Sequence, residues 1–332
     1  MQDRTLSILS SSVFSRRPCS FDQRNLSFIP YGRKVFYFAK GLIFLKSFAV
    51  IGGDSRQARL CGLLVQEGHQ VSAFALERCS LPPQVRVCAS VREACSGADC
   101  VILPMPLSRE QEMLNAPLAR EALPVSDVFA GIEAGTLVCG GAIDAQTQAA
   151  AGQQGIRLID CFEREELAVL NAVPTAEGAV QIAMQELPIT ISQSRCLIIG
   201  NGRIGKALHT RLRGLNAEVS VAARKQQDLA WIAASGGHPV RLADLENELG
   251  SFDLIVNTAP APVLGKSQLR RVRKDALIID LASRPGGVDF DYARELGLRV
   301  NWALSLPGKV APLTSARIVR DTIANIMEEE AR

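Results

Sequence analysis

A glycine-rich segment in the second half of the chain has the residue types and spacing of an anion-binding loop. Residues 200–205 read Gly-Asn-Gly-Arg-Ile-Gly, which matches G-x-G-x-x-G without a mismatch. The first glycine of such a motif permits a tight turn, the second lets a pyrophosphate approach the backbone, and the third lets a helix pack closely. Unpaired N–H groups at the start of that helix then hold the phosphates. The residues that we expect to bind a dinucleotide here are Gly200, Asn201, Gly202, Arg203, Ile204 and Gly205.

The segments on either side of these glycines decide whether the motif is more than an ordinary glycine-rich turn. Residues 196–199 (Cys-Leu-Ile-Ile) are apolar without interruption, as in a parallel strand that is buried on both faces. Residues 206–215 have helical spacing, and residues 218–222 predict a second strand. This order of strand, glycine turn, helix and strand is that of a dinucleotide-binding unit.

The end of the second predicted strand indicates which dinucleotide is bound. NAD sites usually carry Asp or Glu about 20 residues after the glycines, where the carboxylate binds the ribose 2′-hydroxyl. Here the chain reads Ala223-Arg224-Lys225, with two cations and no carboxylate. Cations of this kind suit a 2′-phosphate, so we predict NADP rather than NAD, bound by Arg224 and Lys225. The alternative is a solvated basic turn.

Three polar loops follow later strands of the same predicted sheet, at 257–260, 280–287 and 306–309. Ligands of open α/β sheets bind beyond the carboxyl ends of the strands. We therefore expect the nicotinamide half of the cofactor to contact Asn257, Thr258, Ala259, Pro260 and Ser283. Arg284 and Lys309 are cations near this edge and would suit substrate carboxylates; the alternative is a Gly/Pro-held loop with solvated cations.

The alternation of apolar runs and helical stretches predicts an α/β fold, with two doubly wound Rossmann-like domains and an interdomain cleft. We expect a substrate domain at 47–167, because its first glycine turn (52–53) lacks the dinucleotide spacing. Its strands are predicted near 48–51, 71–75, 85–88, 100–103, 125–129, 137–139 and 157–159. A connecting helix at 168–188, starting at Pro174-Thr175, leads to an NADP-binding domain at 189–306. Residues 307–332 form a loop and a helix that returns to the first domain.

Charge is small overall but unevenly distributed. The net charge of the 332 residues is +3, too small to suggest a nucleic-acid partner. Residues 1–46 contain eight Lys/Arg and two Asp, a net of +6, which leaves 3 − 6 = −3 for the rest. Residues 1–46 also lack periodicity, and the apolar stretch 35–45 is interrupted by Lys40 and too short to span a bilayer. We predict a disordered leader, or a start codon placed too early, and no membrane partner.

The cysteines and histidines exclude two kinds of site. The nine cysteines contain no C-x-x-C pair, which favours reduced thiols in a cytoplasmic protein and no metal site. None of the three histidines (His69, His209, His238) follows a predicted strand at the cleft edge. A 2-hydroxy acid dehydrogenase needs a base to take the alcohol proton, usually histidine, so that reaction is disfavoured.

Several segments together resemble the family of dipicolinate synthase A subunits. The resemblance extends over about 47–327 and is carried by residues 51–57, 162–165, 171–178, 257–258, 280–287 and 306–312. The chain departs from the family after Ala311-Pro312, where Leu-Thr-Ser-Ala replaces the usual Lys-Thr-Ala-Gly. A ligand contact of that lysine would be lost here or pass to Lys309.

The resemblance implies a sporulation enzyme that converts 4-hydroxy-tetrahydrodipicolinate, or its dehydrated form, to dipicolinate. Because this substrate is a small-molecule dicarboxylate, we expect Arg56 and Arg284 to bind it, with Lys309 in reserve. Hydroxyl donors would be Ser55, Ser108 and Thr175. Glu177 or Glu163 would accept the proton, although an interdomain salt bridge is the alternative for either. The resemblance also implies a flavoprotein-like B subunit, together with a location in the mother-cell cytoplasm; a homo-oligomer stays open.

Two other functions stay open at this stage. An NADP oxidoreductase of shikimate-dehydrogenase type would need a catalytic Lys–Asp pair in its first domain. No lysine occurs between Lys46 and Lys206, which argues against that class. The second alternative is an NADP-binding subunit without catalytic residues, whose partner performs the chemistry.

Overall fold

The computed structural model describes residues 35–38, 41–110 and 112–332, and the chain divides into two units, 1–45 and 46–332. Most of the predicted leader therefore lies outside the described residues. Its described part differs from the prediction of a disordered segment, because β1 (Val35–Phe38) pairs antiparallel with β2 (Gly41–Phe44). Both segments are rich in aromatic and branched residues, which favour strands.

The second unit begins with a six-stranded sheet in which all neighbours are parallel. Its order is β10-β9-β6-β3-β4-β5. The strands are β3 (Ser47–Ile51), β4 (Gln70–Phe74), β5 (Arg86–Val87), β6 (Cys100–Ile102), β9 (Leu137–Gly140) and β10 (Arg157–Asp160). A small antiparallel pair, β7 (Ser108–Glu110) and β8 (Met113–Leu114), follows β6. Read from β5, this is the doubly wound order 3-2-1-4-5-6.

A second six-stranded parallel sheet has the same winding, in the order β13-β12-β11-β14-β15-β16. Its strands are β11 (Arg195–Ile199), β12 (Glu218–Ala223), β13 (His238–Arg241), β14 (Leu254–Asn257), β15 (Leu277–Asp280) and β16 (Arg299–Trp302). The strand order reverses between β11 and β14. The glycine motif follows directly after β11, at this reversal point. The predicted fold class, two Rossmann-like domains, is confirmed.

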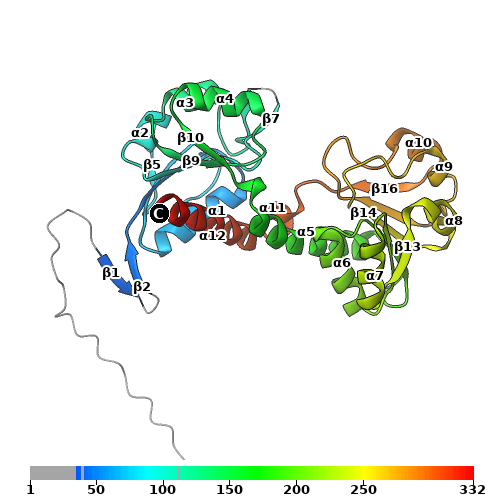
Figure 1. The fold of residues 1–332 in the computed structure, drawn as a ribbon. Helices are drawn as coiled ribbons and strands as arrows, with labels where there is room; N and C mark the ends of the chain where they lie inside the picture. Colours follow the sequence, from blue (N-terminus) through cyan, green and yellow to red (C-terminus); the bar gives the residue numbers. More distant parts are fainter. Residues whose placement is uncertain (1–34, 39–40, 111) are drawn as a thin grey trace, which may run out of the picture. The chain divides into compact units, whose positions relative to one another are not determined.

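Helices cover both faces of each sheet (Figure 1). In the first domain α1 (Ser55–Gln66) packs on one face, and α2 (Val91–Cys95), α3 (Val125–Ala130) and α4 (Ala145–Gln153) pack on the other. In the second domain α6 (Arg203–Gly214) and α7 (Gln226–Ala234) lie on one face. Helices α8 (Leu245–Glu248), α9 (Lys266–Leu269) and α10 (Phe290–Glu295) lie on the opposite face.

Two helices link the sheets. Helix α5 (Glu165–Glu186) contributes Leu167 to the core of the first domain, and Ala176, Ala179 and Ala183 to the core of the second. Helix α12 (Pro312–Glu330) packs against α1 and buries apolar residues in the first core: Ala316, Ile318, Val319, Ile323 and Ile326. The chain thus returns to its first domain after completing the second sheet.

Three sequence predictions about local structure are wrong. The predicted strand at 125–129 is helix α3, because Val125, Val128 and Phe129 bury one helical face. The connecting helix begins at Glu165 rather than at Pro174-Thr175, and Pro174 lies inside it. The predicted loop at 306–309 is helix α11 (Leu306–Val310), which packs on α5.

Among the described residues, α5 is the one helix long and apolar enough to cross a membrane by length and composition. Its surroundings are those of a packed connector. It contacts α6, α11 and α12, and Gly178 faces Leu306 so closely that a Cβ there would lie 3.1 Å from Leu306 Cδ1.

Candidate functional site

The glycine motif forms the turn between β11 and α6. Gly200 adopts φ +105°, and a Cβ there would lie 2.6 Å from Thr258 Oγ1. A Cβ on Gly205 would lie 2.1 Å from the Gly200 carbonyl oxygen, so helix and turn are in direct backbone contact. Around Gly202, in contrast, no atom of the part of the chain that the structure describes would lie within 4 Å of an added Cβ. Gly202 also begins α6 without a side-chain cap, which leaves the first N–H groups available to an anion.

The carboxyl ends of the neighbouring strands are tied together beside this turn. Thr258 Oγ1 donates to the Ile199 carbonyl oxygen at 2.9 Å. Asn257 Nδ2 donates to Asp280 Oδ1 at 2.8 Å, and both side chains are completely buried. Asp280 also accepts from the backbone N–H of Ala282 and Gly287. The Asn257 amide thus holds the two loops in place, and the predicted contact of this residue with the cofactor stays a prediction.

A cavity of about 500 Å³ opens next to the glycine turn. Its lining includes Gly202, Arg203, Ile204, Thr258, Pro260 and Ser283, all predicted to bind the cofactor. The other side is formed by Phe162, Leu167, Ala168 and Asn171, and Leu281 and Ala282 complete it. The structure thus brings six of the predicted cofactor residues to one cavity, bordered by the start of the connecting helix.

Asn171 supplies an unusual group to this cavity. Its Oδ1 is buried and has no hydrogen-bond partner among the described residues. A buried acceptor without a partner is costly in a folded protein, typically by about 1–3 kcal/mol. A donor from a bound ligand would remove that cost, so Asn171 is a candidate ligand contact.

The predicted substrate residues Ser55 and Arg56 begin α1, and neither lines this cavity. Arg56 is 8% exposed, and its guanidinium is bonded to Asp54 and to the Met105 carbonyl oxygen. Ser55 Oγ donates to the Gly308 carbonyl oxygen at 3.4 Å, and a Cβ on Gly308 would lie 3.1 Å from Arg56 Nε. The charge of Arg56 is therefore already matched by Asp54, at 2.9 Å.

Other predicted catalytic residues are engaged within or beside α5. Thr175 Oγ1 donates to the Asn171 carbonyl oxygen at 2.7 Å, and its predicted role as a substrate donor stays a prediction. Glu177 forms an ion pair with Arg211 of α6 at 3.0 Å, which is the alternative that the sequence left open. Glu163 is exposed directly after Phe162, and Ser108 lies in β7. Neither lines the cavity, and their predicted roles stay predictions.

The predicted cations at the sheet edge are exposed. Arg224 and Lys225 follow β12, and neither forms an ion pair with a carboxylate of the described residues. Arg284 is exposed, with its guanidinium carbon 5.9 Å from the centre of the Trp302 ring. Lys309 is exposed on α11. These side chains can reach solvent-borne anions without first breaking a buried ion pair.

Two further residues that were predicted to bind the cofactor, Arg203 and Asn201, contact acidic side chains of the protein. Arg203 pairs with Glu165 at 2.7 Å, and hydrogen bonding to Arg203 lowers the pKa of that carboxyl. Asn201 lines a different cavity, between α6 and α7, and its Nδ2 is 3.5 Å from Asp228 Oδ1. Within the described residues, no group of three or more His, Cys, Asp or Glu is placed to hold a metal ion.

Six of the cavity residues were not selected by sequence reasoning, among them Phe162 and Asn171. Both fall in segments that carry the family resemblance, 162–165 and 171–178, so a signal was present. The remaining information, that these segments face the glycine turn, depends on where α5 begins. That start is nine residues earlier than Pro174, where the sequence suggested it, since α5 begins at Glu165.

Fold and site together define a two-domain oxidoreductase with a nicotinamide-dinucleotide-binding domain. Residues 167–291 match the family described as D-isomer specific 2-hydroxyacid dehydrogenase, NAD binding domain, and residues 47–162 match the N-terminal domain of the dipicolinate synthase A subunit. The A subunit of dipicolinate synthase from Bacillus subtilis is 30% identical over 85% of this chain and 95% of the relative. The chain belongs to the dipicolinate synthase A-subunit family.

Solved structures agree with this assignment. The crystal structure of the dipicolinate synthase A subunit from Bacillus halodurans superposes with a TM-score of 0.78 at 28% identity, covering 85% of this chain and 97% of that one. The corresponding crystal structure from Bacillus subtilis gives a TM-score of 0.77 at 29% identity, over 86% and 96% of the two chains. Membership of a family of A subunits implies a partner subunit.

Proposed function

We propose that this chain is the NADP-dependent subunit of an oxidoreductase that forms dipicolinate from 4-hydroxy-tetrahydrodipicolinate or dihydrodipicolinate. The observation that carries the proposal is the cavity in which the open side of Gly202 meets Thr258, Ser283 and Asn171. It occurs in a member of the dipicolinate synthase A-subunit family. The setting is the cytoplasm of a sporulating mother cell, and the partner is a flavoprotein-like B subunit.

The residues around the glycine turn fit a dinucleotide. The open space above Gly202 and the uncapped start of α6 would hold the pyrophosphate, and Thr258, Pro260 and Ser283 would flank the nicotinamide half. When bound, NADP⁺ supplies the hydride acceptor. Arg224 and Lys225 would bind its 2′-phosphate, because both are exposed at the end of β12.

The substrate must present two carboxylates to cations. Arg284 is the stronger candidate, because it is exposed on the loop that also carries Ser283. Arg56 is held by Asp54 and the Met105 carbonyl, so it would offer only the guanidinium nitrogen that these bonds leave over. In the net reaction the substrate loses water, and then a hydride and a proton, to give the aromatic ring.

An assay of the purified chain tests this proposal directly. Substrate and NADP⁺ are incubated with this chain, with its B partner, and with the two together, and dipicolinate is followed by its ultraviolet absorbance. We expect product that depends on this chain and on NADP⁺. Product formation by the B partner at the full rate without this chain would favour the alternative of a non-catalytic NADP-binding subunit. That alternative is supported by one observation: neither Glu163 nor Glu177 lines the cavity.

Arg224→Ala tests the choice between NADP and NAD. Loss of a charge-assisted bond to the 2′-phosphate should raise the KM for NADP by roughly tenfold or more, while the KM for NAD changes little. Steady-state kinetics with both cofactors measure the two values. Equal losses with both cofactors would contradict the assignment. Arg241→Ala, at the end of the neighbouring edge strand β13, serves as the control.

Arg284→Ala tests the substrate site. Because Arg284 is exposed and forms no described ion pair, its removal should leave folding and dinucleotide affinity nearly unchanged. Turnover should fall by at least ~100-fold, since a carboxylate loses its charge-assisted partner. Arg56→Ala should also lower thermal stability, because the ion pair between the buried Arg56 and Asp54 is lost. Normal turnover in both variants would show that the substrate binds elsewhere.

A further inference from the structure

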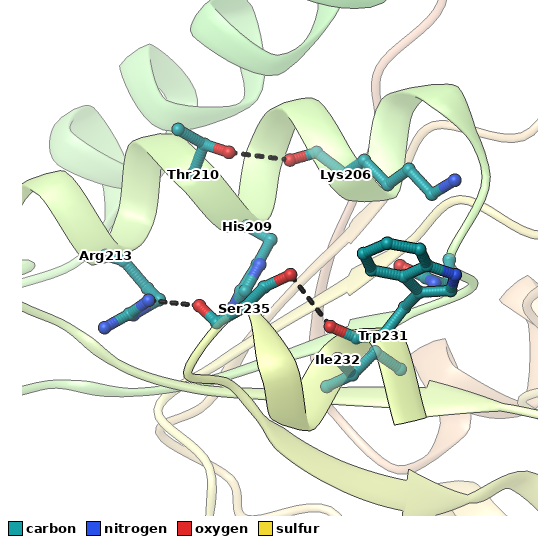
Figure 2. Close-up of a pocket in the computed structure, with 8 residues that line it drawn as sticks. Lys206, His209, Thr210, Arg213, Trp231, Ile232 and Ser235 are labelled. Atoms are coloured by element: carbon teal, nitrogen blue, oxygen red, sulfur yellow. Dashed lines mark hydrogen bonds between the residues drawn. The ribbon is translucent and has the colours of Figure 1, made fainter. Parts of the chain in front are cut away.

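A second cavity, of about 550 Å³, lies between α6 and α7 of the dinucleotide-binding domain (Figure 2). Its lining is Asn201, Lys206, His209, Thr210, Arg213, Trp231, Ile232 and Ser235. None of these residues lines the cavity beside Gly202. The two cavities are therefore separate, and the proposed reaction leaves this one without a role.

The charge of this second cavity is positive. Lys206 and Arg213 lie two turns apart on α6, and both contribute to the lining. Neither forms an ion pair with a carboxylate of the described residues; Arg213 instead donates to the carbonyl oxygen of Ser235. The lining contains no acidic side chain. Asp228, which is 3.5 Å from Asn201 Nδ2, is the acidic residue bonded to this lining.

His209 adds a buried polar atom without a partner. The residue is 7% exposed, and its Nε2 makes no hydrogen bond in the described structure. Figure 2 shows the imidazole projecting from α6 toward the turn at Ser235. Gly237 makes room for it, because a Cβ there would lie 2.6 Å from Nε2. Burial, and secondarily Arg213, lower the pKa of His209, so the ring is neutral at pH 7.

Trp231 supplies an aromatic surface at the mouth of the cavity. It is 67% exposed, more than any other large apolar residue within residues 45–108 and 112–332. Exposed indole rings next to cations are typical of sites that stack a planar ligand. Figure 2 shows the indole and the Lys206 side chain on the same side of the cavity.

We propose that the cavity between α6 and α7 binds a small aromatic carboxylate. The ring would stack on Trp231, and its carboxylates would pair with Lys206 and Arg213. His209 contributes to the cavity wall, with its Nε2 next to Gly237. If the proposed function is right, the product is itself an aromatic dicarboxylate, and the site would sense product at a distance from the reaction.

Fluorescence of the full chain tests this binding without any cofactor or turnover. The sequence has two tryptophans, so Trp302→Phe leaves Trp231 as the reporter, and Trp231→Phe is the matched control. Both variants are titrated with pyridine-2,6-dicarboxylate. Saturable quenching is expected in Trp302→Phe, whereas quenching in Trp231→Phe would report binding beside Arg284, which lies against Trp302. Absence of quenching in Trp302→Phe would overturn the proposal.

Charge variants and other anions test which chemical groups of the ligand the cavity recognises. In the Trp302→Phe background, Lys206→Gln or Arg213→Gln should weaken the affinity roughly tenfold each. Asp228→Asn should keep the affinity or tighten it. Pimelate, which lacks a ring, and inorganic phosphate should bind at least tenfold more weakly; equal binding of either would overturn an aromatic site.

The result of the binding titration can be judged separately from the result of the activity assay. Absence of binding together with NADP-dependent dipicolinate formation would reject the second site alone. Binding together with a chain that forms no dipicolinate would reject the reaction and the product-sensing role, and would keep the site.

Discussion

At the scale of single residues, the glycines of the motif have different physical roles. Gly205 is required by packing, because any side chain there would meet the backbone of Gly200. Gly202 is not required by packing, because none of the described residues lies within 4 Å of its missing Cβ. An empty space kept by a glycine on a helix start is what a phosphate needs.

Alanine substitutions separate these two roles. Gly202→Ala should change the free energy of unfolding by less than ~0.5 kcal/mol and weaken dinucleotide binding at least tenfold. Gly205→Ala should lower the free energy of unfolding by ~2 kcal/mol or more, because backbone atoms must move. Denaturant unfolding and a dinucleotide titration measure both effects. A Gly202→Ala protein with unchanged affinity would place the pyrophosphate elsewhere.

At the scale of elements, α5 decides where the site is. It carries Asn171 at the cavity and Glu177 against Arg211, and it continues through Pro174. Proline lacks the N–H that an interior helical position donates. The Thr175 hydroxyl donates to the Asn171 carbonyl oxygen nearby, at 2.7 Å. A helix that spans both domains in this way fixes one side of the cavity relative to the glycine turn.

Gly178→Val tests the close packing of α5 on α11. A Cβ at this position would lie 3.1–3.2 Å from atoms of Leu306, so a branched side chain should lower the free energy of unfolding by roughly 1–3 kcal/mol. The matched control is Gly152→Ala in α4, where nothing lies within 4 Å of the added methyl. That change should stabilise the protein by about 0.5–1 kcal/mol. Denaturant midpoints compare the two; an unaffected Gly178→Val protein would contradict the packing.

At the scale of the whole molecule, each domain contains one histidine whose burial opposes its charge. Burial lowers the pKa of His69 in the first domain and of His209 in the second below the ordinary value of 6.5. Around His69, Glu67 and Asp99 act in the opposite direction, while Lys46 adds to the lowering. The unfolded chain therefore takes up protons before the folded chain as the pH falls.

Stability should consequently decrease as the pH falls below 6.5. Above pH 7 the free energy of unfolding should be independent of these two groups, because both histidines are neutral in the folded and in the unfolded chain. Denaturant midpoints between pH 7.5 and 5 measure the slope, and the double variant His69→Asn/His209→Asn should flatten it. His238→Asn, at an exposed position, is the control. Exposed carboxyls with lowered pKa values, such as Glu93 and Asp144, act only nearer their ordinary values of 4.5 and 3.8.

Much of the architecture could be predicted because it rests on local patterns. The apolar run 196–199, the glycines after it and the alternation of strands and helices specify two doubly wound sheets. Local sequence patterns gave wrong predictions where the same pattern fits more than one secondary structure. Val125, Val128 and Phe129 suit a strand or a helix, and the packing of one helical face selected α3. Pro174 resembles a helix start, yet the helix begins at Glu165.

By itself the sequence determined the fold class, the dinucleotide loop and the family, because these depend on short-range spacing and on residue types. Tertiary structure alone decided which side chains share a cavity. It buried Asn257 against Asp280, bonded Arg56 to the Met105 carbonyl oxygen, and brought Asn171 to the cavity beside the glycine turn. These outcomes bring together residues that are distant in the chain, such as Asn171 and Gly202 in one cavity lining, and no local pattern encodes such distances.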